Sequence, residues 1–189
     1  MAKGEDEVRV RLQAAALELF RERGYDRTTA AEIAARVGVT ERTFFRQFPD
    51  KREVLFDGEA KLRAALTASI GDAPAGLGPL DTLLRAFRSL QPVLEANRPF
   101  SRPRHEVISA TPALYERELA KTAALADALA AALQARGVAE LRAVLAARTG
   151  MALFVQATVS WLDDPGQGLG ERLDLGFREL KALLAESEH

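Results

Sequence analysis

The sequence predicts an all-α protein with a small three-helix unit at its N-terminus and a larger helical domain behind it. The first observation is residues 28–51, TTAAEIAARVGVTERTFFRQFPDK, where apolar residues recur at near-helical spacing on both sides of Gly38. The second is a series of longer apolar-periodic segments separated by glycine- and proline-rich stretches. The third is size: 189 residues, 48% of them apolar, suffice for a sizeable core.

Residues 28–51 carry the signals of two short helices with a tight turn between them. The hydroxyl of Thr29 can accept from the first turn of a helix while Glu32 reaches back, which is a capping box. Thr40 can cap a second helix, with Glu41 at the positive end of its dipole. Gly38 suits the left-handed end of the first helix. We therefore expect a helix, a glycine turn and a second helix.

Helices this short are marginal alone and need a support. Residues 5–23 supply one, because their apolar residues form a stripe and Gly24 then ends the helix. The stripe contains Val8, Leu12, Ala15, Ala16, Leu19 and Phe20. The three helices match the helix-turn-helix arrangement, in which the second helix of the motif enters the DNA major groove.

Residue types and spacings along this unit resemble the N-terminal domain of the TetR family of bacterial repressors. The matching residues are Gly24-Tyr25, Thr28-Thr29, Ile33-Ala34, Gly38-Val39-Thr40, Thr43-Phe44-Phe45, Phe48 and Lys51. The resemblance implies a DNA-binding domain over residues 1–52 and a ligand-binding and dimerisation domain over residues 53–189. The run from Pro112 to Leu162 is similar to actinobacterial regulators thought to sense acyl-CoA-like molecules.

Phosphate contacts are expected from polar side chains along the motif. Thr29, Thr43 and Gln47 have short polar groups suited to phosphate oxygens, and Lys51 adds a cation to the same row. The family often has a tyrosine where this chain has Phe45, so we expect Phe45 to contact only sugar or a thymine methyl group. These contacts would fix the register of the protein on DNA.

Base reading is expected from Thr40, Glu41 and Arg42 at the front of the second helix. Arg42 can pair bidentately with guanine, and Glu41 can accept from cytosine. The alternative is that Arg42 and Arg46 are solvated surface charges. The inner face of the same helix carries Phe44 and Phe48, which we assign to the core.

Charge is distributed almost evenly. Residues 1–52 contain 11 basic and 9 acidic residues, a net +2, and the rest of the chain has 15 and 18, a net −3. A non-specific nucleic-acid binder would be more basic, so DNA binding must rely on a compact positive surface. Candidates for that surface are Arg27, Arg42, Arg46, Lys51 and Arg52.

The rest of the chain predicts further helices. Asp50 and Glu53 can form a capping box, Pro92 should kink or shorten its helix, and Pro112 behind Thr111 is a strong helix start. We expect helices over residues 50–70, 82–97, 112–136, 138–162 and 169–186, a linker over residues 71–81 and a turn over residues 97–103.

The last two predicted helices are apolar around an arc wider than one core requires. A two-fold homodimer that pairs these helices as a four-helix bundle would cover the excess. It would also hold two reading heads about 34–36 Å apart for a pseudo-palindromic operator. Deeper burial within a monomer is the alternative.

Catalytic chemistry is not expected. The chain has no cysteine, His105 is its only internal histidine, and Ser109 or Ser160 would need a base that spacing does not reveal. Asp163-Asp164 before a proline indicates a helix end and turn. We expect no catalytic residue, metal or cofactor.

No run resembles a signal peptide or a charge-free membrane span, so a cytoplasmic location without membrane association follows by default.

A pocket for a small apolar or amphipathic effector is predicted from the resemblance and from large side chains in the middle helices. The candidates are Phe87, Leu90, Phe100, His105, Ile108, Leu114, Tyr115, Phe154, Thr158 and Trp161. The predicted function is a ligand-responsive transcriptional repressor that binds operator DNA as a homodimer. The alternative is a helical dimerisation or adaptor protein whose N-terminal motif contacts protein.

Overall fold

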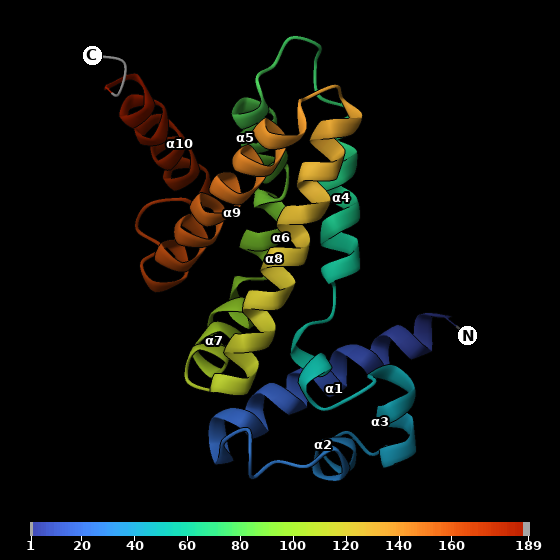
Figure 1. The fold of residues 1–189 in the computed structure, drawn as a ribbon. Coiled ribbons are helices and arrows are strands. Elements are labelled where there is room, and N and C mark those ends of the chain that lie inside the picture. The colour runs from blue at the N-terminus through green and yellow to red at the C-terminus, as the bar shows by residue number, and fades with distance from the viewer. Residues whose placement is uncertain (1, 187–189) are drawn as a thin grey trace. The chain divides into compact units, whose positions relative to one another are not determined.

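The structure, a computed structural model, describes residues 2–186, and the side chains of residues 5–185. This described part contains helices and no strand, so the predicted all-α class is confirmed (Figure 1). The elements are, in order, α1 (Ala2–Arg23), α2 (Ala30–Arg36), α3 (Glu41–Gln47), the 3₁₀ helix η1 (Arg52–Leu55), α4 (Glu59–Gly71), α5 (Pro79–Ser89), α6 (Gln91–Ala96), α7 (Arg98–Ser109), α8 (Pro112–Ala135), α9 (Glu140–Asp163) and α10 (Leu169–Glu186).

The helices form two compact units that are not contiguous in sequence. The first unit combines Met1–Glu59 with Pro99–Glu118, and the second combines Ala60–Arg98 with Leu119–His189. The N-terminal helices therefore share a core with α7 and the start of α8. The division into residues 1–52 and 53–189 remains a prediction about which part does what.

The core of the first unit is built around the predicted motif. Phe44 is fully buried and Phe48 is nearly so, which confirms their assignment to the core, and Ile33 is fully buried in the same cluster. From far along the chain, Ile108 and Leu114 join the same apolar cluster. Two charged contacts support this packing within the unit: Arg104 to Glu118 at 2.9 Å and Arg117 to Glu53 at 2.8 Å.

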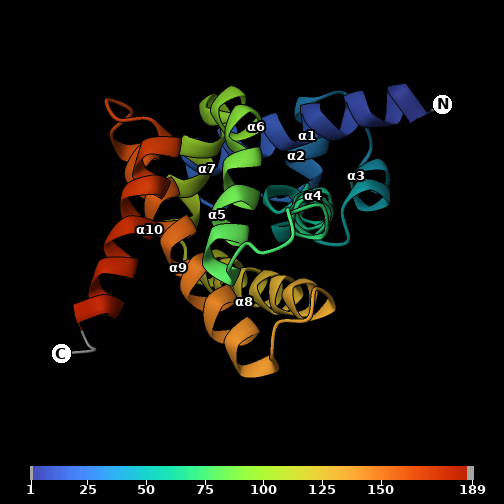
Figure 2. The same ribbon diagram turned by 90° about the horizontal axis from the view of Figure 1, so that it is seen from above.

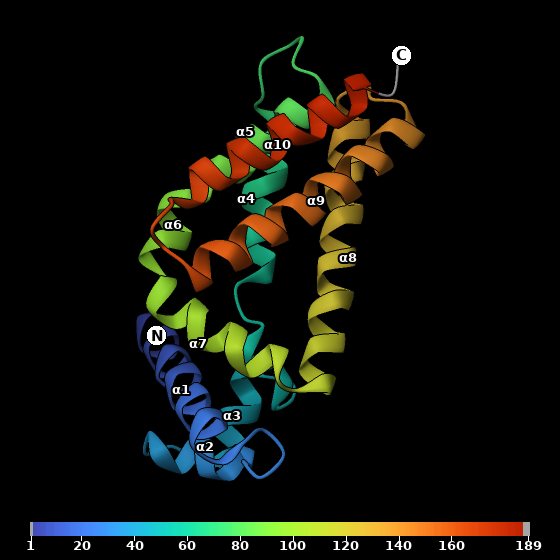
Figure 3. The same cartoon turned by 90° about the vertical axis from the view of Figure 1, so that its left-hand side faces the viewer.

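In the second unit, α5, α9 and α10 pack side by side (Figures 2 and 3). Phe87 of α5 stacks on Phe154 of α9 with ring centroids 4.6 Å apart. Gly150 lets the two helices approach closely, because a Cβ atom there would lie 2.9 Å from a methyl group of Leu83. Helix α9 is long and apolar enough to cross a membrane by length and composition alone. Nine of its residues are buried in this core, and other apolar residues of the helix, such as Leu141 and Leu145, are exposed.

The predicted continuous helix from Asp50 to about residue 70 is wrong. The Asp50 carboxylate does accept from the amides of Arg52 and Glu53, at 2.7 and 3.0 Å, but the helix it starts is the short η1. Gly58, with φ of +93°, then takes a left-handed conformation that no helix can continue through. Helix α4 starts afresh at Glu59.

The predicted turn over residues 97–103 is also wrong, because α7 covers it and holds Pro103 in its interior. Pro99 lies in the first turn, where its missing amide costs nothing. Burial of Val107 and Ile108 on the core then outweighs the one hydrogen bond that Pro103 removes. Elsewhere, α5 begins at Pro79, inside the predicted linker, and the helix predicted over residues 82–97 divides into α5 and α6 at Leu90, next to Pro92.

Candidate nucleic-acid interface

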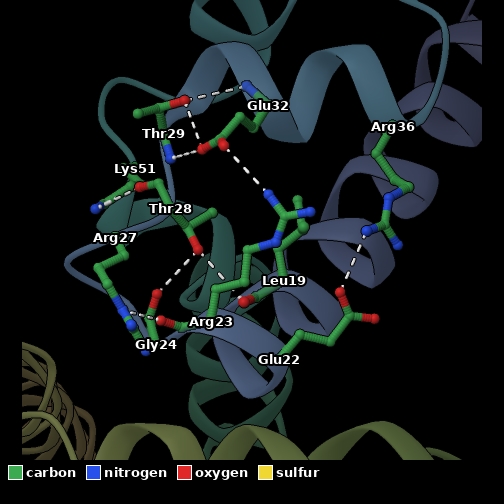
Figure 4. A network of polar contacts seen from close by, with 10 residues as sticks. All are labelled: Leu19, Glu22, Arg23, Gly24, Arg27, Thr28, Thr29, Glu32, Arg36 and Lys51. Atoms are coloured by element: carbon green, nitrogen blue, oxygen red, sulfur yellow. Dashed lines mark hydrogen bonds and ion pairs between the residues drawn. The ribbon is translucent and has the colours of Figure 1, made fainter.

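The capping box predicted at the start of α2 is present. The Glu32 carboxylate accepts from the amide of Thr29 at 2.8 Å and from its hydroxyl at 2.9 Å, and the hydroxyl oxygen accepts from the Glu32 amide at 3.2 Å (Figure 4). The backbone hydrogen bond from Thr29 is the main reason that the pKa of Glu32 lies below its ordinary value. Thr29 is exposed, and its hydroxyl is bonded to Glu32 as both donor and acceptor.

Helix α3 separates an inner face from an exposed one. The hydroxyl oxygen of Thr40 caps the helix by accepting from the Thr43 amide at 3.2 Å, and the two hydroxyls lie 3.0 Å apart. Glu41 and Arg42 follow directly and are exposed. Within the part of the chain that the structure describes, neither side chain makes a hydrogen bond or an ion pair. Of the three predicted base-reading residues, Glu41 and Arg42 are thus free of intramolecular partners within the described residues, whereas the hydroxyl of Thr40 is used in the cap.

Phe45 and Arg46 are on the exposed side of α3, and Gln47 is half-buried at its end. Phe45 is 49% exposed and meets the buried Phe44 ring edge-on, with centroids 5.4 Å apart. The Gln47 side-chain oxygen accepts from Arg9 at 3.4 Å. Phe45 therefore offers an apolar surface, while Gln47 is partly held from within.

Lys51 is held by the loop in front of α2. Its ammonium donates to the carbonyl oxygens of Tyr25 at 2.7 Å and Thr28 at 2.8 Å, and lies 3.9 Å from the centroid of the Tyr25 ring. Burial lowers the pKa of Lys51 from its ordinary value. These two hydrogen bonds use two of the three N–H groups of the ammonium.

Thr28 completes this loop. Its buried hydroxyl donates to the carbonyl oxygen of Gly24 at 2.9 Å, where α1 ends with a φ of +85° (Figure 4). The guanidinium of Arg27 donates to the carbonyl oxygen of Arg23 at 2.7 Å. The loop between α1 and α2 is therefore fixed by side chains rather than by regular structure.

The ten predicted effector residues are divided evenly between the two compact units. Phe100, His105, Ile108, Leu114 and Tyr115 belong to the first, and Phe87, Leu90, Phe154, Thr158 and Trp161 belong to the second. Most are buried, but Tyr115 is 50% exposed. The hydroxyl of Ser109 donates to the carbonyl oxygen of His105 at 2.8 Å, an ordinary bond within helix α7.

Two buried polar atoms in the second unit have no hydrogen-bond partner within the described residues. They are the hydroxyl oxygen of Thr158 and Nε of Arg98. Arg98 donates from Nη2 to the carbonyl oxygen of Leu162 at 2.7 Å, and its guanidinium carbon lies 5.6 Å from the centroid of a Trp161 ring. Thr158 is one helical turn before Leu162 on α9. Sequence reasoning missed Arg98, because its partners lie 64 residues away.

Large apolar side chains remain exposed on the last two helices. Leu141 and Leu145 of α9 are 70% and 57% exposed, and Leu183 and Leu184 of α10 are 62% and 57% exposed. Leu145 and Leu184 also line a hollow of about 510 Å³ in the second unit. Part of the wide apolar arc predicted for these helices is therefore exposed to solvent, within the described residues of one chain. No group of His, Asp and Glu residues within the described part could hold a metal ion.

Two family models match this chain. Residues 12–57 match "Bacterial regulatory proteins, tetR family", and residues 77–185 match "MftR C-terminal domain". The curated "HTH-type transcriptional regulator TcmR" of Streptomyces glaucescens is 43% identical over 75 residues. That match covers 40% of this chain and about a third (33%) of the relative.

Solved structures match over most of the chain. FadR of Thermus thermophilus, described as a TetR-family transcriptional repressor in complex with lauroyl-CoA, is 31% identical, with a TM-score of 0.59. The match covers 90% of this chain and 91% of FadR. NalD of Pseudomonas aeruginosa is 22% identical with a TM-score of 0.60, covering 93% and 96% of the two chains, and shares the fold.

Proposed function

This chain belongs to the TetR family of bacterial regulatory proteins, and from that membership we propose that it is a ligand-responsive transcriptional repressor. It binds a pseudo-palindromic operator as a homodimer in the bacterial cytoplasm. The observation that carries the proposal is the exposed face of α3, where Glu41 and Arg42 have no intramolecular partner within the described residues. A recognition helix needs side chains whose backbone is fixed by the helix and whose polar end groups have no partner within the protein, so that they can bond to base edges.

Contacts to the operator divide by the chemistry of each side chain. Thr40, Glu41 and Arg42 read base edges from the front of α3. Phosphate and sugar contacts come from the remaining predicted residues, namely Thr29, Thr43, Phe45, Gln47 and Lys51. The carbonyl bonds of Lys51 support this division, because they orient its ammonium and use only two of its three N–H groups. The hydroxyl of Thr29 donates to Glu32 and would have to turn away from that carboxylate to donate to a phosphate oxygen.

A homodimer through α9 and α10 supplies the second reading head. The exposed leucines of these helices form an apolar surface that water would otherwise cover, and a two-fold axis pairs the same surface on both copies. Two heads then engage half-sites about one helical turn apart.

The effector is a mostly apolar molecule with a hydrogen-bond acceptor, received near the end of α9 in the second unit. Buried donors without an acceptor cost free energy, and Nε of Arg98 and the Thr158 hydroxyl are two such groups. A carboxylate or acyl carbonyl would supply the missing acceptor. The lauroyl-CoA bound by FadR, the 31% identical relative, has acceptors of this kind beside an apolar chain. Effector binding would weaken operator affinity through a coupling free energy of about 1–3 kcal/mol.

Selection from a random-sequence DNA library tests the repressor proposal. The wild-type protein is expected to enrich a pseudo-palindromic duplex, and Arg42→Ala to lose preference at one position per half-site, a change of about 1–3 kcal/mol. Failure of the wild-type protein to enrich any duplex would favour the alternative, an adaptor whose N-terminal motif contacts protein.

A further inference from the structure

Two arginines of helix α1 each contact the C-terminal end of one helix of the motif. Nη2 of Arg11 donates to the carbonyl oxygen of Val37, the C-cap residue of α2, at 2.6 Å. Nη1 of Arg9 donates to the carbonyl oxygen of Gln47, the last residue of α3, at 2.8 Å. The final carbonyls of a helix have no partner within it and carry partial negative charge, so a guanidinium there satisfies both needs.

Arg9 is also tied down from its other side. Its Nε and Nη2 donate to the two carboxylate oxygens of Asp57 at 2.7 and 2.6 Å, a bidentate pair. Its guanidinium carbon lies 4.6 Å from the centroid of the Phe48 ring, and Gln13 adds a hydrogen bond of 3.3 Å to Asp57. Four hydrogen bonds thus leave one of the five N–H groups of Arg9 unused. Arg9 is therefore oriented inward, toward protein groups.

We infer that Arg9 is a positioning residue for DNA reading, which fixes the end of α3 through the Gln47 carbonyl and is itself oriented by Asp57. Helix α3 has only seven residues and is not stable alone, so the angle at which it presents Arg42 depends on contacts at its ends. Asp57 lies two residues before the start of α4, so this contact is made where the chain leaves the N-terminal helices. The inference rests on the proposed function.

Fluorescence anisotropy with two duplexes tests the inference. One duplex is selected from the random library by the wild-type protein, and the other is a scrambled sequence of the same length. Arg9→Ala and Asp57→Asn are each expected to bind the selected duplex roughly tenfold more weakly, with little change on the scrambled duplex. The salt dependence of binding should keep its wild-type slope, because no phosphate contact is lost.

Three further variants sharpen the test. Arg9→Lys keeps the charge but lacks the planar fork, so it should remain weak. The double variant Arg9→Ala/Asp57→Asn should be no weaker than Arg9→Ala, because both changes break one linkage. Arg102→Ala is the matched control, since it removes an exposed arginine ion pair with Glu106 in the same unit. Its affinity should equal that of the wild type.

Two outcomes would overturn the inference. If Arg9→Ala weakens both duplexes equally and lowers the salt slope by about 1, Arg9 contacts phosphate directly. If neither Arg9→Ala nor Asp57→Asn changes affinity, the pair is an ordinary surface ion pair. Circular dichroism checks folding, and Asp57→Asn, which keeps the size of the side chain, carries the test if Arg9→Ala does not fold. Failure of the proposed function is distinguishable, because the wild-type protein would then select no duplex.

Discussion

Lys51 sits on the ring of Tyr25, with its ammonium nitrogen 3.9 Å from the ring centroid and bonded to the carbonyl oxygens of Tyr25 and Thr28. Lys51→Met keeps the length of the side chain but removes every donor. We expect it to lower the free energy of unfolding by about 1–2 kcal/mol, measured by urea denaturation, because two part-buried carbonyls lose a charged donor.

A matched control for this variant is Arg46→Met, which removes an exposed cation of α3 and should change stability by less than about 0.5 kcal/mol. Equal stability of Lys51→Met and the wild type would mean that water replaces the ammonium without loss. If the third N–H of Lys51 binds phosphate, the slope of operator affinity against salt should also fall by about 1.

Acid should remove the contribution of the Glu32 cap to stability. The pKa of Glu32 in the folded chain lies below its ordinary value of 4.5, chiefly because of the backbone hydrogen bond from Thr29. The stabilisation is therefore present above the unfolded pKa and is lost as pH falls through the folded pKa. Thermal melts from pH 7 to pH 3 should show the wild type more stable than Glu32→Gln at neutral pH, with the difference shrinking toward the acid end. A constant difference across this range would contradict the assignment.

Charges placed on the exposed leucines should separate the dimer. Leu145→Glu and Leu184→Glu each put a carboxylate into the apolar surface of α9 and α10, where pairing would leave it without a partner. Sedimentation equilibrium should show monomers, and binding to the selected duplex should fall accordingly. Leu119→Glu is the control, because Leu119 is 52% exposed and belongs to α8 rather than to these helices. A dimer that survives both substitutions would have to use another surface.

Trp161 is the only tryptophan of the chain and can report effector binding directly. Dodecanoate is expected to change its fluorescence more strongly than 1-dodecanol, because only the acid offers a charged acceptor to Arg98. Arg98→Ala should weaken dodecanoate binding by roughly tenfold or more while leaving the alcohol unchanged. Thr158→Val should weaken it less, and Arg178→Ala, an exposed arginine of α10, should not weaken it. Equal responses to the two probes in every variant would exclude the acceptor site.

Features encoded within a few residues were predictable from the sequence. Thr29 and Thr40 cap the helices that they were predicted to cap, and Pro112 is the first residue of α8, as predicted. Gly38 takes a φ of +74° in the predicted turn. Such signals depend on local backbone hydrogen bonding, which spacing reveals. The aromatic residues on the inner face of α3 were equally clear, because apolar periodicity marks the buried side.

Features that depend on distant partners were not predictable. Arg9 has no neighbour in sequence that indicates Gln47 or Asp57, which lie 38 and 48 positions later. Residues 97–103 predict a turn, because their own neighbourhood does not show the core that Ile108 of the same helix joins. Tertiary burial overrode a local preference there, as it commonly does.

Glu41 and Arg42 stand apart from every other predicted DNA contact in one respect, since their side chains make no hydrogen bond, ion pair or ring contact within the described residues. Exchanging them should alter which sequence is read while leaving the melting temperature almost unchanged. Descendants of such a gene could therefore acquire new target promoters by one or two substitutions at these positions, without first gaining a compensating stabilising change.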